Sequence, residues 1–151
     1  MLLKPKHYMK KLNIGCGKDK LEGYINLDIS REVEPDIVCD IRHGLPFPDD
    51  YFDEVVAYNV LTQIDKEFLF VMNELHRVTK GSIYVRIPIV PNECAWQDPM
   101  DCRRFTSETF TYIEYGHRRY EQYGKHYGFL PFKVEVLEKK EQWKIKLTPK
   151  K

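Results

Sequence analysis

The sequence has no long apolar run, no low-complexity tract and no internal repeat. No window approaches the roughly 18 consecutive apolar residues of a transmembrane helix, and residues 1–11 contain no apolar core of signal-peptide length. These absences argue against a membrane-embedded, fibrous or repeat protein. We therefore expect a cytoplasmic protein that does not act at a membrane.

Cysteine is also sparse, with 4 residues in a chain of 151. No two of them form a Cys-x-x-Cys pair, and their density is far below that of small secreted domains held by disulfides. Neither the cysteines nor the histidines fall at the spacings typical of metal ligands. We expect reduced thiols and no metal site.

The net charge is close to balance, at +1, but the two signs are unevenly distributed. Residues 1–100 carry a net charge of −4, and residues 101–151 carry a net charge of +5. The basic C-terminal third could attract an anionic substrate. Such an excess is more often only a solvated surface, so composition leaves both interpretations open.

Apolar runs along the chain predict strands that alternate with helical or loop connections. The expected strands are residues 11–15, 24–29, 36–41, 52–60 and 82–90, followed by a C-terminal antiparallel pair at 133–139 and 143–147. The clearest helix begins with Asp65 as its cap and stops at Gly81, because apolar residues recur between them at three- and four-residue spacing. A second, short helix is expected from Ser107.

Nearly apolar strands separated by crossovers are typical of a parallel sheet that is covered on both faces. We therefore predict an α/β fold with a Rossmann-like, mostly parallel sheet, arranged as a three-layer sandwich with an antiparallel C-terminal hairpin at its edge. The length fits a single small domain, residues 1–151. In such sheets ligands bind beyond the C-terminal ends of the strands.

The first expected strand ends in Gly15-Cys16-Gly17, and the second ends near Asp28, 11 residues beyond Gly17. Glycines adopt backbone angles closed to other residues and let a ligand approach the main chain. NAD-type proteins instead place G-x-G-x-x-G at the start of a full helix, with an acidic residue about 20 positions further on. Both features are missing here. The glycines alone are compatible with an ordinary turn or with a cofactor loop.

Four blocks of sequence, taken in order, resemble the class I S-adenosylmethionine-dependent methyltransferases, in the subgroup with a compact L-N-[IL]-G-C-G loop and little or no first helix. The blocks are LNIGCGKDKLEGYINLDI, DIVCDIRHGLPFPDDYFDEVVAYNVL, NELHRVTKGSIYVRIP and DPMDCRRFTSETF, within residues 11–113. The resemblance implies S-adenosylmethionine as the cofactor, S-adenosylhomocysteine as the product, and methyl transfer by direct displacement. It also implies the Rossmann-like fold.

The cofactor-binding residues that the resemblance implies are Asn13, Gly15, Cys16, Gly17, Asp28, Ile29, Asp40, Ile41, Tyr58, Asn59 and Val60. The residues of the glycine loop would surround the methionine part of the cofactor, and Asp28 would accept hydrogen bonds from the ribose hydroxyls. Asp40 would take the amino group of the adenine, with Ile41 beside the ring. Residues 58–60 would lie next to the sulfonium and the entering acceptor.

The sequence does not identify the acceptor of the methyl group. Residues 59–63 read Asn-Val-Leu-Thr-Gln where members of the family often have H-x-L-E-H, and no residue identifies itself as a catalytic base. Asp98, Arg103 and Arg104 are the candidate substrate contacts, and the basic side chains favour an anionic acceptor. A small molecule, a protein and a nucleic acid all stay open as the acceptor, and so does the oligomeric state.

Two rival functions compete with methyl transfer. The first is a non-catalytic module that binds S-adenosylmethionine or S-adenosylhomocysteine, and the second is a nucleotide-binding protein of the NAD type. Residues 92–127 combine a long loop with a tyrosine-rich, basic stretch. We expect this segment either to form the acceptor side of the pocket or simply to cover the sheet.

Overall fold

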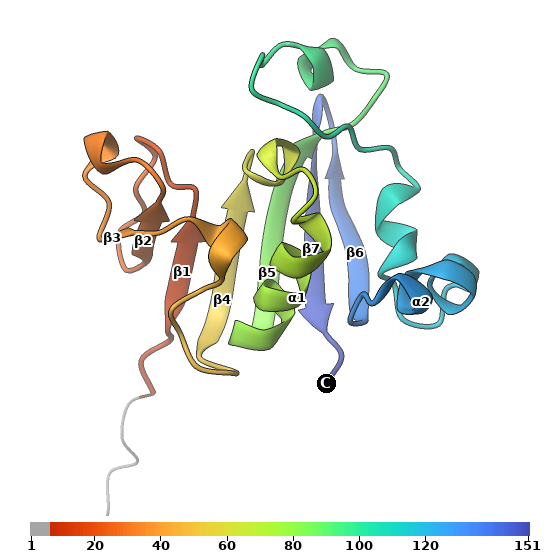
Figure 1. Cartoon of the computed structure of the whole chain (residues 1–151), viewed down its shortest axis with the longest axis horizontal. Helices are drawn as coiled ribbons and strands as arrows, with labels where there is room; N and C mark the ends of the chain where they lie inside the picture. The colour runs from red at the N-terminus through yellow and green to blue at the C-terminus, as the bar shows by residue number, and fades with distance from the viewer. Residues whose placement is uncertain (1–6) are drawn as a thin grey trace, which may run out of the picture.

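A seven-stranded sheet forms the centre of the molecule in the computed structural model, which describes residues 7–151 (Figure 1). The signal-peptide argument rests partly on residues 1–6, which lie outside the described residues. Along the sheet the strands lie in the order β3-β2-β1-β4-β5-β7-β6. Their bounds are β1 Lys11–Ile14, β2 Ile25–Asp28, β3 Ile37–Val38, β4 Phe52–Tyr58, β5 Thr79–Pro88, β6 Phe132–Lys139 and β7 Gln142–Pro149.

Strands β1 to β5 are parallel to one another, whereas β7 pairs antiparallel with both β5 and β6. The chain therefore forms the expected Rossmann-like, mostly parallel sheet with an antiparallel C-terminal pair at one edge. All seven expected strands exist, with bounds that differ by a few residues. The parallel direction brings the C-terminal ends of β1 to β4 to one edge of the sheet, which is where a ligand of such a fold binds.

The longest helix is α1, Phe68–Val78, which is shorter than expected at both ends. The side chain of Asp65 makes no capping bond, since only its carbonyl oxygen accepts from the Phe68 amide, at 3.1 Å. At the other end β5 follows directly, so that Gly81 lies inside this strand instead of stopping the helix. A Cβ at Gly81 would lie 1.9 Å from the carbonyl oxygen of Asp53, which explains the glycine.

The remaining helices are short. They are α2 Lys125–Tyr127, the 3-10 helices η1 Arg31–Val33, η2 Ile41–His43, η3 Leu61–Gln63, η4 Glu93–Trp96 and η5 Thr109–Tyr112, and the π-helix η6 Tyr120–Gly124. The short helix expected from Ser107 begins at Thr109 instead, with no capping side chain. The bond that tightens this turn runs from the Thr106 amide to the Thr109 hydroxyl, at 3.0 Å.

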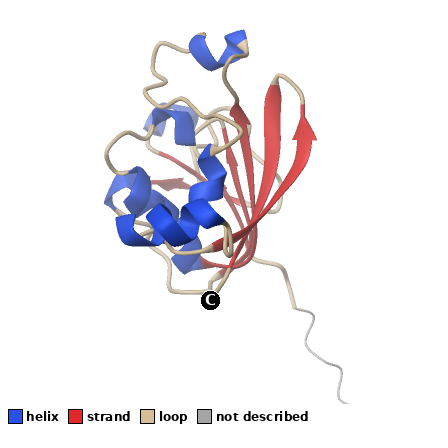
Figure 2. Ribbon diagram, turned by 90° about the vertical axis from the view of Figure 1, so that its right-hand side faces the viewer, coloured by secondary structure: helices blue, strands red, loops and turns tan. Residues whose placement is uncertain are grey.

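Helices α1 and α2 lie on the same side of the sheet (Figure 2). Along β5 the residues that face them, Ile83, Val85 and Ile87, have no exposed surface, whereas Arg86 on the opposite face is exposed. The expected three-layer sandwich is therefore corrected: residues 7–151 build two layers. The crossovers between β1, β2 and β3 contain at most a single 3-10 turn, which is too short to cover a face.

The crossover from β1 to β2, residues 15–24, is held by the amide side chain of Asn26. Its oxygen accepts from the Asn13 side chain at 3.0 Å and from the Leu21 amide at 2.8 Å. Its nitrogen donates to the carbonyl oxygens of Leu21 and Tyr24, at 3.1 and 3.2 Å. Both asparagines are buried, at 3% and 6% exposure, so these bonds satisfy polar groups that would otherwise be costly.

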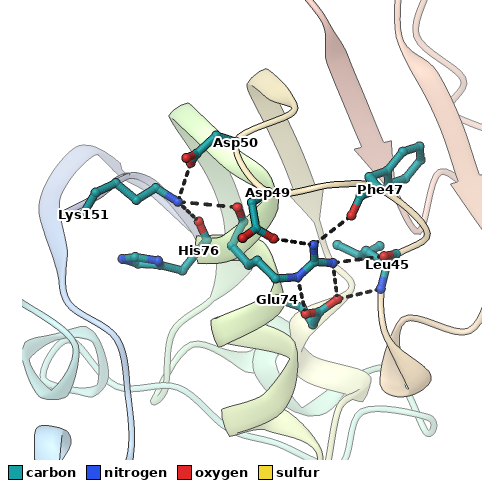
Figure 3. Close-up of polar contacts among 8 residues, drawn as sticks. Leu45, Phe47, Asp49, Asp50, Glu74, His76 and Lys151 are labelled. Atoms are coloured by element: carbon teal, nitrogen blue, oxygen red, sulfur yellow. Dashed lines mark hydrogen bonds and ion pairs between the residues drawn. The ribbon is translucent and has the colours of Figure 1, made fainter.

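Glu74 and Arg77 form an ion pair on α1, and both side chains bond the backbone of the loop between η2 and β4 (Figure 3). The guanidinium of Arg77 donates to both oxygens of Glu74, at 2.6 and 2.8 Å, and to the carbonyl oxygens of Leu45 and Phe47. Glu74 in turn accepts from the Leu45 amide at 2.8 Å. The guanidinium holds the pKa of Glu74 below its usual range. The pair thus positions the chain that leaves η2.

We predict that Glu74→Gln lowers the free energy of unfolding by about 1 to 3 kcal/mol at pH 7, because a mostly buried, charge-assisted contact is lost. Since folding lowers the pKa of Glu74, its contribution is complete above the unfolded pKa of about 4.3 and is lost as pH falls through the folded value. Urea denaturation of both proteins at neutral and acidic pH measures the difference.

Glu22→Gln is the matched control, because Glu22 is exposed and makes no side-chain bond among residues 7–151. It should change stability by less than about 0.5 kcal/mol. A Glu74→Gln difference that persisted unchanged in acid would contradict the assignment to the ion pair.

Candidate functional site

A cavity of about 440 Å³ opens at the C-terminal ends of the parallel strands. Its lining residues follow β1, β2, β3 and β4, so four separate loops meet there. They are Gly15, Gly17, Leu27, Asp28, Ile29, Cys39, Asp40, Ile41, Arg42, Asn59, Val60, Gln63, Ile64 and Met100. Eight of the eleven residues predicted to bind the cofactor are among them.

The two glycines of the first loop have different roles. Gly15 has φ +60°, and a Cβ there would come within 2.6 Å of the Val60 side chain. Gly15 therefore allows the loop after β1 to touch the loop after β4. Gly17 has φ +51° and no atom within 4 Å of the position that its Cβ would take. The space beside Gly17 is open to a ligand that approaches the backbone.

Asp28 links the first loop to the end of β2. One carboxylate oxygen accepts from the Gly17 amide at 2.8 Å, and the other accepts from the Ser30 amide at 2.9 Å. A carboxylate offers about four acceptor positions, so two stay available to a ligand. Asp28 can therefore hold the glycine loop and accept from two neighbouring hydroxyls, as expected for the ribose of the cofactor.

Asp40 caps η2 and is bonded by Arg42, a residue that the sequence analysis did not assign to the site. The guanidinium of Arg42 donates to both oxygens of Asp40, at 2.9 and 2.8 Å, and lowers the pKa of this carboxyl group. The Arg42 amide also bonds the carboxylate, at 3.0 Å. Asp40 is thus held ionised at the cavity wall, next to the buried side chain of Ile41.

Asn59 follows β4 in a left-handed conformation, with φ +57°. Its side chain accepts from the amide of Gln142 at 2.9 Å, which ties the end of β4 to the C-terminal hairpin. Val60, the next residue, packs against Gly15. The segment beside the expected position of the sulfonium is therefore held from two sides.

Three residues predicted to bind the cofactor do not line the cavity. Asn13 is buried in the crossover network, where it donates to Asn26 and to the Asp19 carbonyl oxygen. Cys16 is 4% exposed, and burial raises the pKa of its thiol. Tyr58 points to the opposite face of the sheet, under the guanidinium of Arg86 at 4.3 Å. Successive side chains of a strand point to opposite faces of the sheet, so Asn13 on β1 and Tyr58 on β4 point away from the face that α1 covers.

The three candidate substrate residues lie beside the cavity without lining it. Asp98 accepts weakly from Gln63, at 3.4 Å, and Met100 two residues on reaches the lining. Arg103 donates to the carbonyl oxygens of Ile64 and Asp65, at 3.0 and 2.8 Å.

Arg104 follows the same pattern as Arg103. It donates to the carbonyl oxygen of Asp101, at 2.8 Å, and lies over the ring of Trp96 at 4.8 Å. The guanidinium groups of Arg103 and Arg104 therefore organise the backbone around the site.

Six lining residues were missed by sequence reasoning: Leu27, Cys39, Arg42, Gln63, Ile64 and Met100. Leu27 and Ile64 look like ordinary core residues in the sequence, and both are indeed buried. Arg42 carried a usable signal, because it follows directly on the Asp40-Ile41 pair at a strand end. Met100 comes from a segment far along the chain, and only the tertiary fold brings it to the site.

Part of the chain matches a known protein family. Residues 12–85 match the family model described as a methyltransferase domain. This match and the fold make the chain similar to the class I S-adenosylmethionine-dependent methyltransferases. S-adenosylmethionine is the cofactor that this similarity implies, and the open space at Gly17 and the free acceptor positions of Asp28 fit it. No curated protein matches the sequence significantly.

Several solved structures share the fold at low sequence identity. The PH0226 protein of Pyrococcus horikoshii aligns with a TM-score of 0.65 and 16% identity, over 97% of this chain and 84% of that one. An S-adenosylmethionine-dependent methyltransferase of Methanosarcina mazei gives 0.62 and 18% over the whole of both chains. One from Archaeoglobus fulgidus gives 0.60 and 23%, over 88% of this chain and 66% of the other.

Residues 7–151 contain neither a membrane-spanning helix nor a cluster of metal ligands. No helix in this range is long and apolar enough to cross a membrane. No three histidine, cysteine or acidic residues of the described range gather closely enough to hold a metal ion. All four cysteines are free.

We predict that Asp28→Asn weakens binding of S-adenosylmethionine by about 1.5 to 3 kcal/mol, or roughly 10- to 150-fold in Kd. The charged acceptor of the ribose hydroxyls is lost, while one carbonyl oxygen remains for the backbone amides. Isothermal calorimetry measures the Kd, and thermal unfolding checks that the variant is folded.

Asp19→Asn is the matched control, since Asp19 lies on the same crossover, is exposed, and loses the same charge. It should bind within about twofold of the parent protein. Equal losses for both variants would mean that Asp28 does not touch the cofactor.

Proposed function

We propose that the protein transfers the methyl group of S-adenosylmethionine to an acceptor by direct displacement. The observation that carries this proposal is the cavity at the C-terminal ends of β1 to β4. It brings Gly15, Gly17, Asp28, Asp40 and Val60 together in a chain similar to a family that uses this cofactor. The residues proposed to bind the ribose and adenine, Asp28 and Asp40, are acidic, and Val60, Ile64 and Met100 add apolar side chains to the same lining.

The cofactor, when bound, supplies a methyl group that its sulfonium already activates, so the protein has mainly to align the reactants. Gly15 and Gly17 let the ligand reach the backbone, and Asp28 fixes its orientation. Asn59, held by Gln142, sets the position of the loop where the acceptor would meet the cofactor. A general base is needed only for an acceptor that is protonated at neutral pH.

The acceptor would enter from the side of residues 98–104. The hydroxyl of Thr62 donates to Asp101 at 2.7 Å, and its carbonyl oxygen accepts from the amides of Cys102 and Arg103, at 3.0 and 2.9 Å. This segment is thus fastened to the loop after β4, and Met100 from it lines the cavity. The bonding supports the proposal that residues 92–127 form the acceptor side.

The same segment also borders a second cavity of about 380 Å³, between α1 and residues 103–129. Arg103 lines it together with Phe68, Phe110 and Tyr127, and Ile64, whose carbonyl oxygen Arg103 holds, lines the first cavity. We propose that the non-reacting part of the acceptor lies on this side. An anionic acceptor remains a proposal, although Arg103 and Arg104 already donate to backbone carbonyl oxygens.

A non-catalytic module that binds S-adenosylmethionine is the second candidate. Its support is the segment Asn59–Gln63, which provides amide and hydroxyl groups where many members of the family provide imidazoles and a carboxylate. An NAD-type nucleotide-binding function has less support, because a single crossover of ten residues, 15–24, replaces the helix on which a pyrophosphate would rest.

Turnover separates these candidates. The purified protein is incubated with S-adenosylmethionine and a panel of anionic, neutral and amine acceptors, and S-adenosylhomocysteine is followed by mass spectrometry. We expect product with at least one acceptor, binding of S-adenosylmethionine by calorimetry, and no binding of NAD. Cofactor binding without turnover on any acceptor would favour the binding module, and binding of NAD alone would contradict the proposal.

Arg103→Ala probes the acceptor side in the same assay. We expect a loss of turnover of about tenfold or more with cofactor binding nearly unchanged, because the variant frees the segment that faces the reacting atoms. Arg31→Ala is the matched control, since Arg31 lies outside residues 92–127, is exposed and has no side-chain partner among residues 7–151. Equal turnover in the two variants would remove residues 98–104 from the acceptor side.

A further inference from the structure

Helices α1 and α2 leave one face of the sheet uncovered (Figure 2). That face carries a cluster of aromatic and basic side chains on three neighbouring strands. We call this cluster the open face. It consists of Tyr58 on β4, Tyr84 and Arg86 on β5, and Lys144 and Lys146 on β7. The strand register places Tyr58, Arg86 and Lys144 in one row across the sheet, and Tyr84 and Lys146 in the next.

Cations lie over the aromatic rings of the open face. The guanidinium carbon of Arg86 is 4.3 Å from the ring centre of Tyr58, and the ammonium of Lys144 is 5.7 Å from that of Tyr84. Arg86 is exposed, so the side of its guanidinium away from Tyr58 faces solvent. The guanidinium of Arg86 is flat and lies over the Tyr58 ring. Its solvent-facing side can therefore stack against another flat group, such as the aromatic ring of a ligand.

The carboxylates around the open face are already paired with other groups. Glu54 bonds the Tyr24 hydroxyl and lies 3.9 Å from Lys11. At the other side of the face, Glu135 pairs with Lys133 at 3.5 Å and Glu138 pairs with Lys140 at 2.5 Å. The sheet therefore presents basic groups at its centre and neutralised pairs at its margins.

The three cations of the open face itself have no such partner. Within residues 7–151, Arg86, Lys144 and Lys146 form no ion pair with a carboxylate at 4.0 Å or less. Glu138 lies opposite Lys144 in the strand register, and the cations Lys140, Lys144 and Arg86 lower the pKa of its carboxyl group. The three cations still outnumber this carboxylate, so an anionic partner is favoured and contact with a second copy of the same face is disfavoured.

We propose that the open face binds a single strand of nucleic acid, independently of the methyl-transfer site. Basic side chains along neighbouring strands would neutralise successive phosphates, and unpaired bases would stack on the tyrosine rings and on the guanidinium of Arg86. A paired duplex hides the flat surfaces of its bases, so the aromatic component selects for a single strand. No base-specific hydrogen bonding is required, and binding is expected to tolerate many sequences.

The test is fluorescence anisotropy of a labelled uridine oligomer of about 12 nucleotides, titrated with the full chain at several salt concentrations. We expect a Kd of about 1 to 100 µM at low salt, weaker binding as salt rises, and much weaker binding of a duplex of equal length. An oligomer of deoxythymidine compares DNA with RNA, and binding of either single strand supports the proposal.

Two sets of variants separate charge from stacking. Lys144→Ala combined with Lys146→Ala should weaken binding about tenfold or more and reduce the slope of log K against log salt by about 1.4. Tyr84→Leu keeps an apolar side chain but removes the ring, and it should weaken binding about fivefold or more. Calorimetry with S-adenosylmethionine should give the parent Kd for both, which shows that they are folded.

The control is Lys66→Ala combined with Arg118→Ala, which removes the same two charges from exposed positions outside the open face. It should change the oligomer Kd by less than about twofold. Three results would overturn the proposal: no binding of the uridine or deoxythymidine oligomer, a duplex bound as tightly as the single strand, or an equal loss in the control. Binding only to anionic lipid vesicles, or self-association without oligomer binding, would overturn it as well.

Discussion

The hydrogen bond between the side chains of Asn13 and Asn26, 3.0 Å long and buried between β1 and β2, makes the short first crossover of this protein possible. Parallel strands are normally joined by a dozen or more residues, usually including a helix. Here ten residues, 15–24, make the connection, and the two asparagines supply the backbone partners that a helix would supply internally. Substitution of either amide would leave several buried polar groups without a partner.

Two consequences follow from this constraint. The crossover begins at once after β1, so Gly15 and Gly17 lie at the strand end, where the Gly17 amide reaches Asp28. The short crossovers between β1, β2 and β3 also leave one face of the sheet without a helical layer, and tyrosine rings with cations over them lie on that face. The position of the cofactor loop therefore depends directly on these ten residues of sequence.

Much of the fold could be predicted from the sequence, because alternation and turn residues report local structure directly. The C-terminal pair, β6 and β7, alternates except at the irregularity between Val136 and Glu138, and its predicted place at the edge is confirmed. Features that depend on contacts between distant segments were harder to predict. The sequence suggests that Gly81 ends a helix, but a glycine is required there because the carbonyl oxygen of Asp53, on the neighbouring strand, leaves no room for a Cβ.

The candidate site shows the same division. The loops after β1 and β2 stand out because glycines and an acidic residue follow apolar runs, whereas Asp40 and Ile41 after β3 were implied by the family resemblance. Asn13 and Tyr58 were assigned to the cofactor by resemblance, whereas their own alternation sends them to the opposite face. Met100 could not be assigned from local pattern, since it arrives from a distant segment. Arg42, which acts through Asp40, could have been found from its place directly after Asp40 and Ile41.

The most direct test of the central claim is an amide NMR titration of isotope-labelled protein with S-adenosylhomocysteine, which locates the binding site without assuming turnover. The account predicts that the largest shifts fall on Gly15, Gly17, Ile29 and Ile41, whereas the amide of Lys146 on the open face does not move. Shifts centred on the open face or on the second cavity, with the glycine loop unchanged, would contradict it.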